Sequence, residues 1–459
     1  MRKISKISLV ATVAVAGFST ANAQPLEEAI KNVDVSGSVV YRYDNFGQDK
    51  INGVRGDDAN RSGNNNYKIG LNLSSKVNDY VKFNSRFIVG SQDNGGFASL
   101  NSGRDGNTAG SDGQADVSLS NAYFGFTAIP NTVVNVGKQG LTTPYTVATD
   151  INGNEQTGTG ILALSNVGPV TFGAGYFNNT NLDNSSEVNA SQGLGLNRNY
   201  INTLTDTTQP LANAGYRSND IVNGGTDLYV ATVQGDLDFV KLEAWYLGAQ
   251  ETFNSYTLAT TSTLDLAENA KIGLEARYVY LKLTNDARTG IASSIDTALG
   301  GVGFTADDLE SKNDMFRLAV DGKFSIVNAR LAYTKTGKHG GLTALDQDAK
   351  NTSLGWAITS NGVANADYIQ VALGADILDN LNFTLNYGNL KSKEDANATK
   401  TRILTDDIKA QEVYGQLTYK MSKNLTTYLR YGTYEEKVNS TGIKVMDQNR
   451  GRIQVAYTF

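Results

Sequence analysis

The sequence predicts an all-β protein: an antiparallel β-barrel that crosses a membrane with about 18 strands, or about 16. Three observations predict it. Apolar and polar residues alternate with a period of two along most of the chain. The segments between these stretches are alternately short and long. An export signal opens the sequence, and no apolar run after it reaches the roughly 20 residues of a membrane-spanning helix.

Composition removes several classes of site. The chain has 459 residues, with no cysteine and one histidine. Zinc sites built on cysteine, iron–sulfur clusters, disulfide scaffolds and multi-histidine metal centres are therefore excluded. The formal net charge of −6 argues against a nucleic-acid partner that needs a broad basic face.

Residues 1–23 have the features of a cleaved signal peptide. Arg2, Lys3 and Lys6 form a positive start, residues 7–18 are apolar, and Ala21-Asn22-Ala23 fits a cleavage site. We expect residues 24–459 to form a single barrel domain. Cleavage removes three bases and no acid, so the mature chain has 37 basic and 46 acidic residues.

The alternation is clear in the first expected strand, residues 33–43. Val35, Val39 and Tyr41 lie on one face, and Ser36, Ser38 and Arg42 lie on the other, because successive side chains of a strand point to opposite faces. The same pattern recurs to the end of the chain, where Ile453, Val455, Tyr457 and Phe459 share one face. One side of the sheet is thus apolar and the other polar.

The connections favour an outer-membrane barrel over a soluble sandwich. Short turns are expected at 77–79, 129–131, 167–169, 235–236, 267–269, 321–323, 378–380 and 422–424. Longer polar stretches are expected at 47–65, 92–115, 141–159, 179–225, 251–256, 286–312, 335–365, 392–410 and 436–448. Outer-membrane barrels have short periplasmic turns, long external loops and usually an even strand number. We therefore expect a protein in the outer membrane of a Gram-negative bacterium.

Both ends of the chain resemble one known family. The segment Pro25-Leu-Glu-Glu-Ala-Ile-Lys-Asn-Val-Asp-Val-Ser-Gly37 is similar to the start of the Campylobacter-type major outer membrane proteins. The terminal Phe459 is typical of outer-membrane barrels generally and is expected to act in barrel assembly. The resemblance implies an 18-stranded, trimeric diffusion porin, and it implies calcium in the pore.

A barrel of this size encloses an aqueous channel whose selectivity depends on width and lining charge. The expected inward bases are Arg42, Lys68, Lys82, Arg86, Lys138, Arg277, Arg317, Arg330, Arg430 and Arg452. The connection 141–159 is the candidate constriction loop, since it carries Asp150 and Glu155 but no base. We predict passive diffusion of small hydrophilic solutes with a modest preference for cations. The alternative is that these acids lie in a solvated external loop.

A calcium site is a further hypothesis. Residues 150–155 begin like an EF-hand loop, but Glu155 replaces its glycine and Ile161 replaces its final glutamate, so that motif fails. A looser site of Asp116, Asp150 and Glu275 remains possible because calcium takes oxygen ligands from separate segments. No cofactor is required for the expected function.

The competing interpretation is a surface adhesin or structural outer-membrane protein whose long connection 179–225 binds a partner. An enzyme is not expected, because the only histidine, His339, lies in a glycine-flanked loop and has no evident nucleophile. The expected partners are outer-membrane lipid, small solutes and cations, and further copies of the chain.

Overall fold

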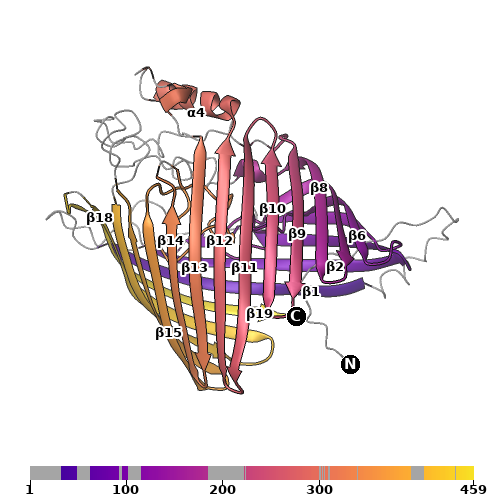
Figure 1. Cartoon of the computed structure of the whole chain (residues 1–459). Coiled ribbons are helices and arrows are strands. Elements are labelled where there is room, and N and C mark those ends of the chain that lie inside the picture. The colour runs from indigo at the N-terminus through magenta and orange to yellow at the C-terminus, as the bar shows by residue number, and fades with distance from the viewer. Residues whose placement is uncertain are drawn as a thin grey trace.

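A computed structural model describes residues 33–48, 62–91, 96–101, 115–184, 222, 224–298, 301, 303, 305–308, 311–338, 340–393, 408–439 and 441–459. These residues form one large antiparallel sheet that curves into a barrel (Figure 1). The predicted signal peptide, residues 1–23, lies outside the described residues.

The strands follow the chain in order around the barrel. They are β1 (Val33–Gln48), β2 (Ser62–Asn78), β3 (Val81–Gly90), β4 (Ala98–Asn101), β5 (Asp116–Phe126), β6 (Thr132–Gly140), β7 (Thr157–Val167), β8 (Val170–Thr180), β9 (Leu228–Leu237), β10 (Val240–Ala249), β11 (Phe253–Ala267), β12 (Ala270–Leu283), β13 (Lys312–Phe324), β14 (Val327–Thr336), β15 (Asp367–Leu378), β16 (Leu381–Lys391), β17 (Ile408–Lys420), β18 (Leu425–Val438) and β19 (Lys444–Thr458).

The barrel closes between its first and last strands. β1 pairs antiparallel with β19, with Val39 opposite Tyr457, and Phe459 exchanges backbone hydrogen bonds with Gly37 at 2.9 and 3.1 Å. The short β4 pairs only with β2, beyond the end of β3. Without it, 18 strands complete the circuit, which confirms the predicted all-β antiparallel barrel and selects 18 strands over 16.

The distribution of side chains is the reverse of that in a water-soluble protein. Val35 is 54% exposed on the outside, whereas Arg42 is only 5% exposed on the inside. Large apolar residues line the outer surface of nearly every strand, and many charged residues are buried inside. Because hydrocarbon cannot hydrogen-bond the backbone, a closed sheet with an apolar exterior is the stable way for strands to cross it.

The connections differ at four places from the prediction. Gly235 and Asp236 lie inside β9, and residues 321–323 lie inside β13; the turns follow at 238–239 and 325–326. In these turns Asp238 and Ser325 adopt positive φ angles of 61° and 54°. The predicted turns therefore lay a few residues too early in the chain. Two expected long connections are also short, at 250–252 and 439–443, because the flanking strands extend into polar sequence.

Helix is scarce in the described part of the chain. α4 (Asn285–Ala298) and the short helices η2 (Leu182–Asn184) and η3 (Ala306–Asp308) lie in connections between strands. Among the described residues, none of the helices combines the length and apolar character needed to span a bilayer.

Candidate functional site

Two connections fold into the barrel. One is the stretch 141–156 between β6 and β7, and the other is the stretch 340–366 between β14 and β15. They are hydrogen-bonded to each other: the Leu345 amide donates to the Tyr145 carbonyl at 2.8 Å, and the Gln156 side chain donates to the Leu345 carbonyl at 2.7 Å. We call them the first and second inward segments.

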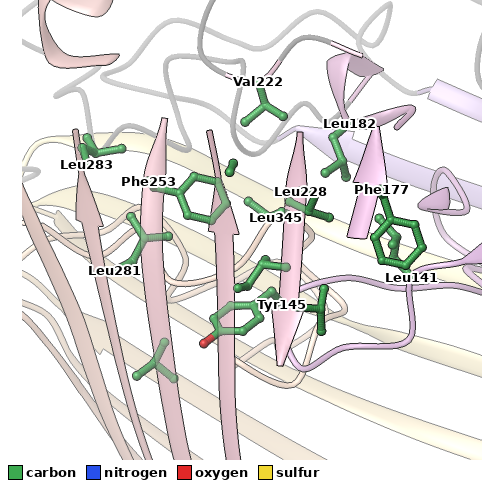
Figure 2. Packing of buried hydrophobic residues seen from close by; sticks show 14 of the residues in the cluster. Leu141, Tyr145, Phe177, Leu182, Val222, Leu228, Phe253, Leu281, Leu283 and Leu345 are labelled. Carbon is green, nitrogen blue, oxygen red and sulfur yellow. The ribbon is translucent and has the colours of Figure 1, made fainter. Parts of the chain in front are cut away.

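An apolar cluster attaches both segments to one side of the wall. Leu141 and Tyr145 from the first segment and Leu345 from the second pack with residues of β8 to β13, including Phe177 and Leu228 (Figure 2). The polar inner face that the alternation predicts is therefore replaced by apolar side chains in this part of the barrel. The reason is that the inward segments cover it, so apolar residues there are buried and favourable.

On the opposite side, the first inward segment is held by an ion pair. Arg86 of β3 donates to Glu155 through Nε and Nη2, at 2.8 and 2.6 Å, and Ser120 donates to the same carboxylate at 2.7 Å. Arg86 is 7% exposed and Glu155 is 3% exposed. The predicted constriction acid Glu155 thus lies inside the barrel but is neutralised by the wall.

Two further bases of the wall position the same segment. The Lys68 ammonium of β2 donates to the carbonyls of Asp150 and Gly153. Arg42 of β1 donates through Nη2 to the side-chain oxygen of Asn152 at 2.9 Å. The first inward segment therefore reaches from the apolar cluster to Arg42, Lys68 and Arg86, which we call the basic wall. It does not lie in an external loop.

Three carboxylates meet where the inward segments touch. Oxygen atoms of Asp150, Asp346 and Asp348 lie within 4.8 Å of one another. Burial, followed by repulsion from Asp348, raises the pKa of Asp150 to about 6. Asn152 donates to Asp348 at 2.6 Å and thereby links this group to Arg42. We refer to Asp150, Asp346 and Asp348 as the acidic group.

The ligand atoms of the acidic group can be compared with those of a calcium site. Its carboxylate oxygens are hard donors of the kind that calcium takes, so the residues fit that ion. Asp116 and Glu275, which the sequence suggested beside Asp150, are not in this group. Glu275 instead accepts from Arg317 at 2.6 Å and from Arg277 at 3.1 Å, and Asp116 begins β5.

The other predicted arginines lie on β12, β13, β14, β18 and β19. Arg277 and Arg317 donate to Asn351 and to the Lys350 carbonyl, so they hold the second inward segment, and Arg330 pairs with Asp321 at 2.6 Å. Arg430 and Arg452 lie on β18 and β19, directly opposite each other in the sheet.

Sequence reasoning missed the contribution of the second inward segment. Asp346, Asp348 and Trp356 come from it, and Glu412 of β17 accepts from the backbone amides of Trp356 and Ala357 at 3.0 and 2.7 Å. The only available signal was the length of the connection 335–365. The alternative site 179–225 falls mostly, and His339 entirely, outside the described residues.

Several solved bacterial structures are similar to this chain. OpdL of Pseudomonas aeruginosa is 14% identical, with 94% of this chain and 99% of that chain covered and a TM-score of 0.63. OccAB1 of Acinetobacter baumannii is 15% identical, with 96% and 98% covered and a TM-score of 0.62. OprD of Pseudomonas aeruginosa is also 15% identical, with 96% and 95% covered and a TM-score of 0.57. These likenesses show the shared fold.

A search of curated proteins gives no match. The model of the family described as Campylobacter major outer membrane protein, in contrast, matches residues 1–459, the whole length of the sequence. This match shows that the chain belongs to the Campylobacter major outer membrane protein family. Together with the closed barrel and its apolar outer surface, it identifies the chain as a porin of the Gram-negative outer membrane.

Proposed function

We propose that this porin lets small hydrophilic solutes diffuse passively, that its two inward segments form the constriction, and that it modestly prefers cations. The acidic group carries this proposal. It lies where the two segments meet, and Asp348 is its most open member. A cation in a narrow, partly dry passage gains more from such charges than it would in bulk water.

The basic wall places positive charge on the side of the constriction opposite the carboxylates. Arg42, Lys68 and Arg86 approach the first inward segment from β1, β2 and β3. Bases on one side and carboxylates on the other produce a transverse field, which orients dipolar solutes and separates the paths of cations and anions. The preference for cations is therefore expected to be modest.

Conductance in planar bilayers tests the proposal. A potassium chloride gradient should give a reversal potential shifted toward that of potassium. Asp348→Asn should reduce the shift, whereas Asp265→Asn, at an exposed carboxylate paired with Lys271, should leave it unchanged. A reversal potential toward chloride would overturn the cation preference, and the absence of conductance would overturn the channel.

A calcium ion bound by the acidic group is also proposed. Asp150, Asp346 and Asp348 would hold it, and its charge would join the two inward segments while offsetting their mutual repulsion. Calcium should raise the thermal unfolding temperature of the detergent-solubilised protein, since a ligand that binds only the folded state stabilises it. An equal rise in Asp150→Asn, or none in the parent protein, would contradict this site.

We also propose that the porin assembles as a homotrimer, as the family resemblance implies. Light scattering coupled to gel filtration in a mild detergent measures the protein mass of the particle. A mass of one chain after gentle extraction would contradict the trimer and leave the channel itself untouched.

A further inference from the structure

We propose that the arginines and aromatic rings around Trp356 form a binding subsite for flat organic carboxylates on the wall of the lumen. This inference rests on the proposed channel in one respect: the carboxylate must reach the lumen from water. It concerns β17 to β19 and the second inward segment, and it shares no residue with the acidic group.

Three guanidinium groups surround one indole ring. The Cζ atoms of Arg450, Arg430 and Arg452 lie 5.1, 5.2 and 5.9 Å from the centre of the Trp356 ring. Tyr414 meets the same ring edge-on, with centroids 5.4 Å apart. Each of the three guanidinium contacts is within the range at which a cation is attracted to an aromatic face.

The three positive charges of this cluster are only partly balanced by nearby acids. Arg430 and Arg452 are direct cross-strand partners, an arrangement of like charges that destabilises a sheet. Asp44 pairs with Arg452, accepting from Nε and from Nη2. The guanidinium of Arg430 donates to the amide oxygen of Gln416 at 2.8 and 2.6 Å, and it has no carboxylate partner among the described residues.

Of the three arginines, Arg450 has the most buried guanidinium nitrogens without a hydrogen-bond partner among the described residues. Its Nε and Nη1 atoms have no hydrogen-bond partner in the described part of the chain. Glu412, a nearby acid whose charge attracts this guanidinium, accepts from the amides of Trp356 and Ala357. Donors without partners and incompletely compensated positive charge are costly inside a protein, so the cluster favours an anion.

The chemistry of the cluster narrows the kind of anion. A guanidinium offers parallel donors that match the two oxygens of a carboxylate. Trp356, Tyr414 and Tyr428 are half-buried and lie beside these donors, so they provide apolar faces for a planar body. Acetate has the carboxylate but no planar body, whereas benzoate has both.

Bilayer recordings with benzoate test the subsite. Benzoate should reduce the single-channel current at a concentration several times lower than acetate. Trp356→Leu and Arg450→Gln should each raise the half-blocking concentration about tenfold. Trp356→Phe, which keeps an aromatic ring, should stay close to the parent. Arg330→Gln, at an arginine paired with Asp321, should not change it.

A second measurement does not depend on conductance. The chain has two tryptophans, so in a Trp245→Phe background the emission of Trp356 reports on this site alone. Benzoate should change that emission saturably, and Arg450→Gln should weaken the response about tenfold. Equal effects of benzoate and acetate in both assays would overturn the subsite. A protein without conductance whose Trp356 still responds to benzoate would overturn the channel and keep the subsite.

Discussion

Breaking the ion pair between Arg86 and Glu155 should release the first inward segment. In Glu155→Gln the buried guanidinium loses its counter-charge, and removing one partner of a buried pair costs about 3–5 kcal/mol. Glutamine can still accept from Arg86 and Ser120, so we expect the lower end, about 3 kcal/mol. Local opening of the segment should then become roughly a hundredfold more frequent.

Hydrogen exchange of the purified porin in detergent measures this opening. The amides of Gln156 and Leu345 are suitable reporters, since they donate to Val147 and Tyr145 and so tie the segment to itself and to its neighbour. Their exchange should accelerate about a hundredfold, while amides in the centre of β12 should not change. Recordings of single channels should show more current noise.

The double variant decides whether the pair is the cause. Arg86→Gln combined with Glu155→Gln removes both charges of the pair, so the Arg86 guanidinium is no longer left without its partner and exchange should be slower than in Glu155→Gln alone. Exchange at the parent rate in the single variant would refute the reasoning, as would a double variant that opens more than the single one.

Three further predictions follow from the same structure. Lowering the pH through about 6 should reduce the preference for cations, because Asp150, whose pKa burial raises to about 6, gains a proton and loses its charge; reversal potentials of the parent and of Asp150→Asn should converge at low pH. Gly355→Ala should lower the free energy of unfolding by about 1–3 kcal/mol, since the new Cβ would lie 1.6 Å from the Glu412 carboxylate. In Gly290→Ala the new Cβ meets nothing within 4 Å, so the free energy of unfolding should stay the same or rise. Leu331→Arg on the lipid-facing surface should cost about 2–4 kcal/mol in folding titrations from urea into vesicles, and Leu331→Phe should cost little.

The sequence by itself determined the barrel. Alternation such as that of Val39, Tyr41 and Arg42 reflects one apolar and one wet face, and lipid allows only a closed sheet to carry such strands. The inward bases Arg42, Arg86 and Arg317 followed from the same parity, which is local information. Turn positions were less certain, because glycine and aspartate also occur inside strands, as Gly235 and Asp236 show.

Only the tertiary structure decided what the inward residues do. Glu155 is neutralised by a base 69 positions away in the chain, and Asp150 meets Asp346 and Asp348 from a connection far beyond it. Trp356 is placed among arginines of β18 and β19 in the same way. Period-two patterning reports which face a side chain takes. It carries no information on which distant loop enters the barrel, since that depends on packing between segments that are remote in sequence.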